Sequence, residues 1–247
     1  MSKSFIRLIS KIKGSSNSLE FYFPEISQGL IAYDKYRGQS AEIISNRAYH
    51  YTSFEKDTLK KWLWGGDVNR YSVQWNSKEY IDYCDGIANP RSPKYFLRER
   101  VLIREITNPS IFAAITDEEL YNDPSVLIVL SSEEYSSKVL VAILNSKLAT
   151  FYHFNNAPKA TKGAFPKILV KDIKEFPLPE INNKQEAIII NLVDRILGAK
   201  KSDPTADTST LENEIDFMVY KLYGLVYEEV LTIDPKTSIT QQQYENK

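Results

Sequence analysis

The sequence predicts an α+β protein in which a mixed or antiparallel sheet comes first and a helical hairpin follows. Residues 94–106, "KYFLRERVLIREI", alternate between two kinds of side chain with the period of a β-strand. Residues 125–131, "SVLIVLS", form a continuous apolar run that is typical of a buried strand. From residue 183 onward, apolar residues recur at steps of three and four, as they do along one face of a helix.

The first of these segments leads into an antiparallel arrangement. Its odd positions are mostly apolar, and its even positions carry Arg98, Arg100 and Arg104. Residues 107–110, "TNPS", predict a turn, and "IFAAIT" predicts a returning strand. The arginine face has two interpretations: it contacts a polyanion, or it is a solvated sheet face paired with the acids at 117–119.

The helical part begins before the end of the sheet-rich part. Residues 133–154 carry one apolar stripe and predict a helix. Later, residues 183–201 and 209–225 predict two helices joined by a linker, with Ser209 and Glu212 at the spacing of a capping box. Gly224 lies where the second helix is expected to end. The apolar stripe of this hairpin has three possible destinations: this chain, another protein portion, or a second copy.

These elements divide the chain into four parts. Residues 1–20 predict a loose arm or a basic amphipathic helix, 21–180 a sheet-rich domain, 181–230 a helical spacer or hairpin, and 231–247 a polar tail. The Pro-flanked stretch "AFPKILVKDIKEFPLP", residues 164–179, is expected to connect the sheet-rich domain to the helices.

Composition narrows the class of protein. Of 247 residues, 43% are hydrophobic and 12% aromatic, which is enough for a substantial core and excludes disorder throughout. The formal charge is −1, but residues 1–110 hold 17 Lys and Arg against 12 Asp and Glu, and eight of the nine arginines lie at or before Arg104. Such segregation suits a basic face for a polyanion, although chance clustering on a solvated surface gives the same numbers.

Several chemistries are not supported. Cys84 is the sole cysteine, so no internal disulfide is expected and a reducing, cytoplasmic setting follows by default. His50 and His153 lack zinc-ligand spacing and are expected to be packing or surface residues. There is no G-x-S-x-G, Walker or G-x-G-x-x-G motif, and no apolar stretch of about 20 residues that would span a membrane. We therefore expect no catalysis by this chain alone.

Six stretches, in this order, resemble a known family: "ISQGLIAYDKYRGQSAEIISNRAYHY", "LWGGDVNRY", "YFLRERVLIREI", "VAILNSKLATFYH", "GAFPKILVKDIKEFPLP" and "LENEIDFMVYKLYGL". Together they are similar to the TaqI-like C-terminal specificity domain of type IIG restriction-modification enzymes, which is itself similar to half of a type I specificity subunit. The resemblance covers about residues 22–230 and implies a target recognition domain that reads double-stranded DNA.

In that family a methyltransferase and a nuclease accompany this domain. The family's Asn-Pro-Pro-Tyr motif and S-adenosylmethionine glycine loop have no counterpart here, and "ANPRSP" at 88–93 is only a superficial echo. The resemblance therefore implies that S-adenosylmethionine and Mg²⁺ belong to a catalytic portion elsewhere, in cis or in trans, and that this chain has no cofactor. A homodimer through the C-terminal helices is a further possible partner, and a membrane is not expected.

The candidate DNA-contacting residues are the long polar and cationic side chains of the first part and of the loop after residue 156. They are Lys35, Arg37, Gln39, Arg47, Arg70, Arg91, Lys94, Arg98, Arg100, Arg104, Lys159 and Lys162. The loop "YDKYRGQS" is the first expectation for base contact because Gly38 permits close backbone approach between two bidentate side chains. An ordinary turn with an Arg37–Asp34 pair is the simpler alternative. Tyrosines 33, 36, 49 and 51 are interleaved and could stack or donate to phosphate.

Two other functions fit parts of the sequence. The chain could be an assembly module that docks a catalytic subunit through the helical pair and contacts no DNA. A complete nuclease is the weaker of the two because no metal site can be placed in the sequence.

Overall fold

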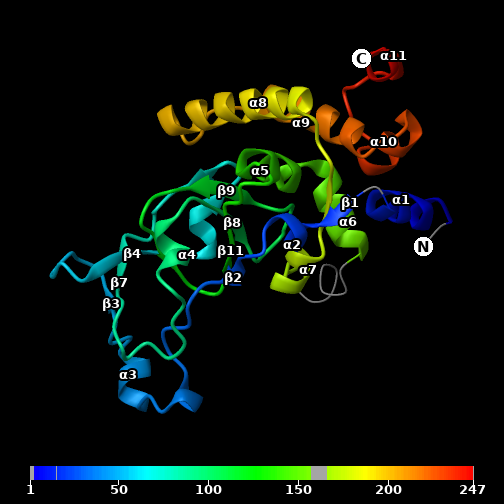
Figure 1. Ribbon diagram of the computed structural model, residues 1–247. Coiled ribbons are helices and arrows are strands. Elements are labelled where there is room, and N and C mark those ends of the chain that lie inside the picture. The colour runs from blue at the N-terminus through cyan, green and yellow to red at the C-terminus, as the bar shows by residue number, and fades with distance from the viewer. Residues whose placement is uncertain (1–2, 15, 157–165, 247) are drawn as a thin grey trace.

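The computed structural model describes residues 3–14, 16–156 and 166–246 (Figure 1). It is an α+β fold with mixed and antiparallel sheets and C-terminal helices, as the sequence predicted. The central sheet is antiparallel throughout, with the order β2–β11–β8–β9. Its strands are Ile26–Gln28 (β2), Arg100–Arg104 (β8), Ala113–Thr116 (β9) and Val126–Leu130 (β11).

Both faces of this sheet are buried, because successive side chains of a strand point to opposite sides. In β11, Leu127 and Val129 belong to a first hydrophobic core, whereas Val126, Ile128 and Leu130 belong to a second. The continuous apolar run at 125–131 is therefore explained by two cores, one on each side of a single strand.

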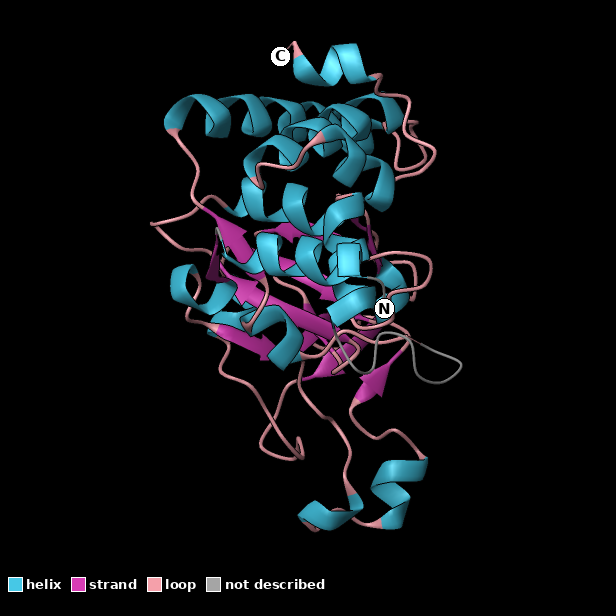
Figure 2. Ribbon diagram, turned by 90° about the vertical axis from the view of Figure 1, so that its right-hand side faces the viewer, coloured by secondary structure: helices cyan, strands magenta, loops and turns pink. Residues whose placement is uncertain are grey.

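Helices cover the face of the sheet that meets the first core. Figure 2 shows them as a layer above the strands. They are Ser137–Asn145 (α5), Lys147–Asn156 (α6), Asn183–Ser202 (α8), Ser209–Leu222 (α9) and Tyr227–Ile233 (α10). We call these helices and the first core the helical body. Residues from α5, α8 and α9 share that core, so the apolar stripe of the hairpin is buried within this chain.

A smaller mixed sheet forms the far end of the molecule, with the order β10–β4–β7–β3 and one parallel pair, β10 with β4. Its strands are His50–Tyr51 (β3), Leu59–Leu63 (β4), Glu79–Asp82 (β7) and Tyr121–Asn122 (β10). Short helical segments accompany it: Lys35–Arg37 (η1), Ala41–Ser45 (α3), Gly65–Asp67 (η2) and Lys94–Leu97 (α4). We call residues 31–64 and 75–98 the distal lobe; β3, β7 and α3 lie far from α8 in Figure 1.

The remaining elements tie the ends of the chain to the body. They are Lys3–Gly14 (α1), Ser16–Ser18 (β1), Leu19–Tyr22 (α2), Val68–Asn69 (β5), Ser72–Val73 (β6), Val170–Lys174 (α7), Pro177–Pro179 (β12) and Gln241–Glu245 (α11). Strand β12, at the end of the Pro-flanked stretch, pairs with β1, and Tyr223 donates a hydrogen bond to the carbonyl of Pro177 at 2.7 Å. The connector is thus built into the helical body.

Local structure differs from expectation at several places. Residues 94–97 are helical, and the strand begins only at Arg100, because the turn at Pro93 starts α4. Residues 133–154 were expected to form one helix. They instead contain α5 and most of α6, which are separated by Ser146 in an extended conformation. Near the N-terminus, α1 buries Leu8 and Ile12, as expected for the amphipathic alternative to a loose arm. In the tail, α11 buries Tyr244.

Candidate nucleic-acid interface

The η1 loop is an exposed cationic feature of the distal lobe. Asp34 caps it by accepting a hydrogen bond from the Tyr36 backbone N–H at 2.8 Å, and Gly38 closes it with φ 81°, a left-handed conformation that suits glycine. The Tyr36 side chain is 85% exposed, and Lys35 and Arg37 on either side of it are exposed as well. The loop therefore presents an aromatic ring between two cations.

Gln39, expected to contact bases, holds this loop in place. Its amide nitrogen donates to the carbonyls of Ala32 and Gly86 at 2.9 and 2.7 Å, and its amide oxygen accepts from the Asp34 N–H at 2.8 Å. Because these bonds use both donors and one lone pair, the side chain acts as a brace between the loop and the segment around Gly86.

Arg47 lies between α3 and β3 and pairs with a carboxylate of β7. Its guanidinium makes two hydrogen bonds to Glu79, at 3.1 and 2.9 Å, and lies 5.6 Å from the centre of the Trp64 ring. The Trp64 indole N–H donates to the same carboxylate at 2.9 Å. The hydrogen bonds from Arg47 hold the pKa of Glu79 below its usual value. Arg47 itself has φ 49°, a left-handed conformation that is uncommon for a residue other than glycine.

A group of aromatic side chains, Tyr33, Tyr49 and His50, packs next to Arg47 in the distal lobe. The rings of Tyr33 and Tyr49 are stacked with centroids 5.6 Å apart, and the Tyr33 hydroxyl accepts from the Tyr49 N–H at 2.8 Å. The same hydroxyl is 2.8 Å from Nδ1 of His50. Burial lowers the pKa of His50 to about 4, so its imidazole is neutral at physiological pH. Tyr33 and Tyr49 are therefore structural supports. The exposed ring of Tyr36 has the Lys35 ammonium 4.9 Å from its centre, and the two side chains together face solvent.

Three further candidates surround α4. Arg91 donates to the Asn89 side chain at 2.7 Å, and Lys94 pairs with Glu25 at 2.6 Å. The hydrogen bond from Lys94 is the largest cause that lowers the pKa of Glu25. Arg98 is exposed at the end of the helix. These residues form a second group of cations on the distal lobe, of which Lys94 is committed to a carboxylate.

Arg100, expected on an exposed cationic face, is instead fully buried. Its guanidinium donates to the backbone carbonyls of Arg98, Glu118 and Leu120 at 2.8, 3.0 and 3.0 Å. Burial lowers its pKa to about 10. The even face of β8 packs on the second core, which leaves no room for a ligand. The acidic segment at 117–119 does meet this arginine, but through main-chain oxygens.

Arg70 and Arg104 also lie away from the η1 loop. Arg70 pairs with Glu212 on α9 and donates to the carbonyl of Asn145 at 2.6 Å, so it fastens the β5–β6 turn to the helical body. Arg104 is half-buried, with its guanidinium 5.0 Å from the centre of the Phe112 ring. Lys159 and Lys162 lie outside the described residues.

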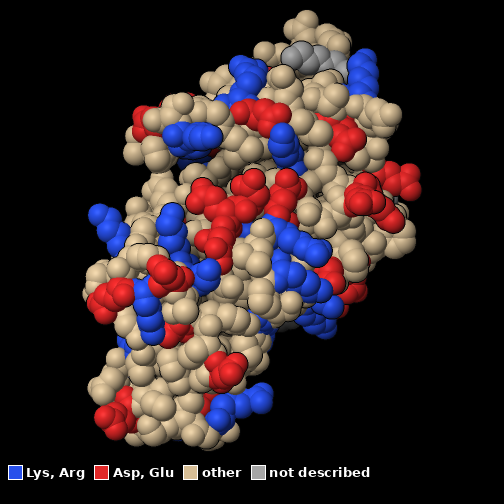
Figure 3. Space-filling model, turned by 60° about the vertical axis from the view of Figure 1, so that its left-hand side comes forward, with Lys and Arg blue, Asp and Glu red and all other residues tan. Residues whose placement is uncertain are grey.

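The expected single basic face is therefore divided. Figure 3 shows Lys and Arg side chains interleaved with Asp and Glu across the side of the molecule that it presents. Ion pairs explain this pattern, since Arg47 meets Glu79, Lys56 meets Asp82 and Lys60 meets Glu119. The structure brings Lys35, Arg37 and Arg47 into the distal lobe as one group, and it places Arg70, Arg100 and Arg104 in the framework.

Sequence reasoning missed Trp64 and Glu79. The only local signal was the turn "WGGD", in which an aromatic residue precedes two glycines. Gly65 lies against Ser125, with its N–H donating to the Ser125 hydroxyl at 2.8 Å, and this contact fixes the direction of Trp64. Glu79 is 32 residues from Arg47 in the sequence, so the pair could not be recognised without the fold.

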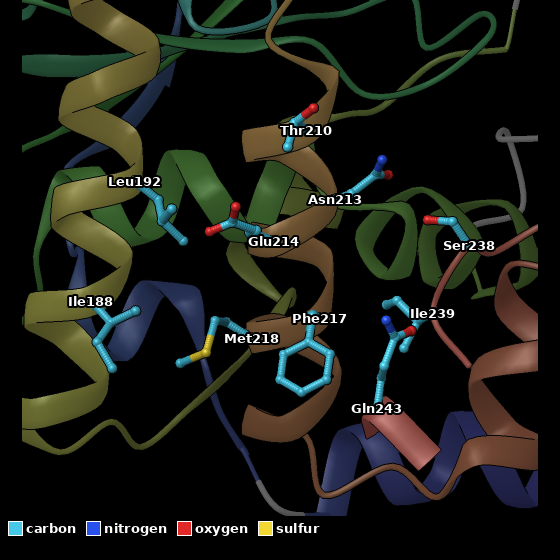
Figure 4. A pocket seen from close by; sticks show the side chains of 10 residues that line it. All are labelled: Ile188, Leu192, Thr210, Asn213, Glu214, Phe217, Met218, Ser238, Ile239 and Gln243. Atoms are coloured by element: carbon cyan, nitrogen blue, oxygen red, sulfur yellow. The ribbon is translucent and has the colours of Figure 1, made fainter. Parts of the chain in front are cut away.

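A hollow of about 580 Å³ lies elsewhere, between α8, α9 and the C-terminal segment (Figure 4). Its apolar lining comes from Ile188, Leu192, Phe217, Met218 and Ile239, and none of the candidate DNA-contacting residues that the structure describes lines it. In the part of the chain that the structure describes, no group of three or more His, Cys, Asp or Glu side chains is arranged to hold a metal ion. None of the helices of residues 3–14, 16–156 and 166–246 combines the length and hydropathy of a membrane span.

The fold places a central sheet between a layer of helices and a small projecting lobe. Residues 60–178 match the sequence model of the TaqI-like C-terminal specificity domain. This match confirms the family resemblance over residues 60–178, the part of the chain that the family model covers. No curated protein matches the chain.

Solved structures align with this chain at low sequence identity, and the first of them shares its fold. The type IIL restriction-modification enzyme MmeI, solved in complex with DNA, aligns with TM-score 0.61 and 12% identity over 90% of this chain and 36% of that one. The type IIG restriction endonuclease BpuSI aligns with TM-score 0.49 and 12% identity over 90% and 34%. The HsdS subunit from Thermoanaerobacter tengcongensis aligns with TM-score 0.43 and 11% identity over 88% and 50%. The present chain thus spans about a third of the length of MmeI and of BpuSI.

Proposed function

We propose that this chain is the sequence-reading module of a type IIG-like restriction-modification enzyme, and that it binds double-stranded DNA through the distal lobe. Methyl transfer and cleavage are assigned to a separate portion, in cis or in trans, which would hold S-adenosylmethionine and Mg²⁺. The observation that carries the proposal is the η1 loop, in which two exposed cations flank an exposed ring inside a fold of this family.

The two cations of the loop have different expected roles. A lysine ammonium is a compact charge that suits a phosphate, whereas a guanidinium can donate two parallel hydrogen bonds to O6 and N7 of guanine. Neither Lys35 nor Arg37 forms an ion pair within the described part of the chain. Since Gln39 braces the loop beforehand, little conformational entropy is lost on binding. We therefore assign Lys35 to the phosphate backbone and Arg37 to a base edge.

The test is a selection of bound sequences from a randomised duplex library, with the wild type, Arg37→Ala and Lys35→Ala. Arg37→Ala should lose about 10- to 100-fold of the preference at one base pair, since a bidentate contact is worth about 1–3 kcal/mol of discrimination. Lys35→Ala should weaken binding to all sequences by the same factor. Uniform weakening by Arg37→Ala would move that residue to the phosphate class.

A separate result would favour the alternative in which the chain only docks a catalytic subunit. If the wild type binds no duplex at about 50 mM salt, where phosphate contacts are strong, the DNA-reading proposal fails. Incubation of duplex DNA with the pure chain, Mg²⁺ and S-adenosylmethionine should give neither cleavage nor methylation, and either activity would contradict the assignment of catalysis to another portion.

A further inference from the structure

The outer face of the distal sheet carries aromatic side chains that the proposed function does not use. In the cross-strand register, Tyr80 on β7 lies opposite Tyr51 on β3 and opposite Lys61 on β4. Its neighbour Ile81 is fully buried in the second core. Because side chains alternate along a strand, this row of residues points away from the core.

Two further rings extend the row beyond the strands. Phe54, from the β3–β4 connection, is 59% exposed, and its ring centroid lies 5.6 Å from that of Tyr80. Trp75 lies 4.9 Å from Tyr80, and its indole N–H donates to the Glu79 carbonyl at 3.0 Å, which fixes the orientation of the ring. We call Tyr51, Phe54, Lys61, Trp75 and Tyr80 the aromatic face.

Lysines accompany the rings. The Lys61 ammonium lies 5.2 Å from the centre of the Trp75 ring, and it forms no ion pair with any residue that the structure describes. Lys56 lies 4.8 Å from the Tyr51 ring and pairs with Asp82 at 2.5 Å. The face thus combines the exposed ring of Phe54 and the half-buried rings of Tyr51, Trp75 and Tyr80 with a lysine that has no carboxylate partner among the described residues. This combination suits a polyanion that also offers flat apolar surfaces.

We propose that the aromatic face binds single-stranded DNA, with unpaired bases stacked on Phe54, Trp75 and Tyr80 and a phosphate near Lys61. Rings with adjacent cations are the usual platform for single strands, because every base has a face that can stack. A duplex keeps its bases stacked on one another and cannot use the rings in this way.

This surface is separate from the one that would read the duplex. Glu79, which holds Arg47, alternates with Tyr80 along β7 and points to the opposite face of the sheet. The η1 loop contributes nothing to the aromatic face. The two ligands can therefore be tested independently of each other.

The test is fluorescence anisotropy with a labelled oligothymidylate of about 12 nucleotides, within the range that one such platform covers. Phe54→Ala should weaken binding at least about fivefold, since stacking on one ring is worth about 1–3 kcal/mol. Lys61→Ala should also weaken binding and should make it less dependent on salt, since it removes a phosphate contact. Both side chains are exposed, so the variants should fold. Tyr36→Ala, which removes an exposed ring from the η1 loop, is the matched control and should leave this affinity unchanged.

Duplex binding by the same proteins separates the two proposals. The aromatic-face proposal predicts that Phe54→Ala keeps the duplex affinity and sequence preference of the wild type. It is overturned if the wild type binds no oligothymidylate, if Phe54→Ala leaves that binding intact, or if Tyr36→Ala reduces it equally. Self-association that Phe54→Ala abolishes, without any oligonucleotide binding, would instead assign the face to a second copy. If the wild type binds oligothymidylate but prefers no duplex sequence, the duplex-reading proposal fails and the aromatic-face proposal stands.

Discussion

The helical body and the distal lobe use the same cationic side chains in different ways. In the body, Arg70 pairs with Glu212 on α9, and Lys147 at the start of α6 pairs with Asp234 at 2.7 Å. In the distal lobe, Lys35 and Arg37 extend from a braced loop and form no ion pair with the described residues. A cation that has a carboxylate within reach holds the fold together, and one that has none is available for a ligand. The distinction depends on the fold and not on the residue type.

The largest effect should come from a framework arginine. Arg100→Ala removes the donor from three backbone carbonyls, of which that of Leu120 accepts a buried hydrogen bond, and opens a cavity between the central sheet and the second core. We expect a loss of about 3–5 kcal/mol in the free energy of unfolding, measured by urea denaturation. Arg98→Ala, two residues away and exposed, is the control and should change stability by less than about 0.5 kcal/mol. A loss below about 1 kcal/mol for Arg100→Ala would contradict its structural role.

Two double-mutant cycles compare the regions directly. The Arg70–Glu212 pair joins the β5–β6 turn to α9 and is mostly buried, with side-chain exposures of 29% and 19%. We expect a coupling of about 1–2 kcal/mol in the free energy of unfolding. For Arg47–Glu79, in which the arginine is 45% exposed, we expect about 0.2–1 kcal/mol. A stronger coupling in the distal lobe would mean that Arg47 belongs to the framework.

A further comparison concerns pH, to which the two regions should respond with opposite sign. Burial lowers the pKa of His50 in the distal lobe from 6.5 to about 4. Its contribution to stability is present above pH 6.5 and is lost as the pH falls toward 4, because only the unfolded chain takes up the proton. Burial raises the pKa of Asp216 in the body from 3.8 to about 6. Its contribution is present below pH 3.8 and is lost as the pH rises through 6.

Variants that cannot titrate isolate the two effects. Asp216→Asn keeps an oxygen for the Lys147 N–H, which the carboxylate accepts at 2.9 Å, and His50→Gln keeps a polar partner for Tyr33. Relative to its variant, the wild type should gain stability between pH 6 and 4 at Asp216 and lose it over the same range at His50. If the free energy of unfolding of a variant and of the wild type changes with pH in parallel, the pKa of that residue is the same in the folded and the unfolded chain, which would contradict the prediction.

Much of the fold could be predicted from periodicity, because periodicity reports local packing. The strands at 113–116 and 126–130 and the hairpin of α8 and α9 are confirmed. The end of the second helix near Gly224, at φ 61°, is as expected, but the Ser209–Glu212 capping box is wrong: Ser209 is the first residue of the helix, and it is the hydroxyl of Thr208 that bonds to Glu212, at 2.7 Å. These features depend on neighbours within one or two turns of the chain.

The functional site was predictable only in part, because ion pairs join distant segments. Arg37 and Lys35 could be chosen from their place beside Gly38 in a polar loop. The burial of Arg100 depends on carbonyls 18 and 20 residues away, and the pairing of Arg70 depends on a glutamate 142 residues away. Alternation in β8 gave the correct side for Arg100 but could not show that a second core lies there. Carboxylates brought close by tertiary structure determined which cations remained available.

The most direct test of the central claim is the salt dependence of duplex affinity. The double variant Lys35→Ala/Arg37→Ala removes the cations of the distal loop, and Lys184→Ala/Lys201→Ala removes two exposed lysines of α8 in the helical body. If the distal lobe meets DNA, the slope of the logarithm of affinity against the logarithm of salt concentration should become shallower by about 1 in the first variant, because Lys35 is the residue assigned to a phosphate, and should stay unchanged in the second. An unchanged slope in the first variant, or an equal change in both, would contradict the assignment of DNA binding to the distal lobe.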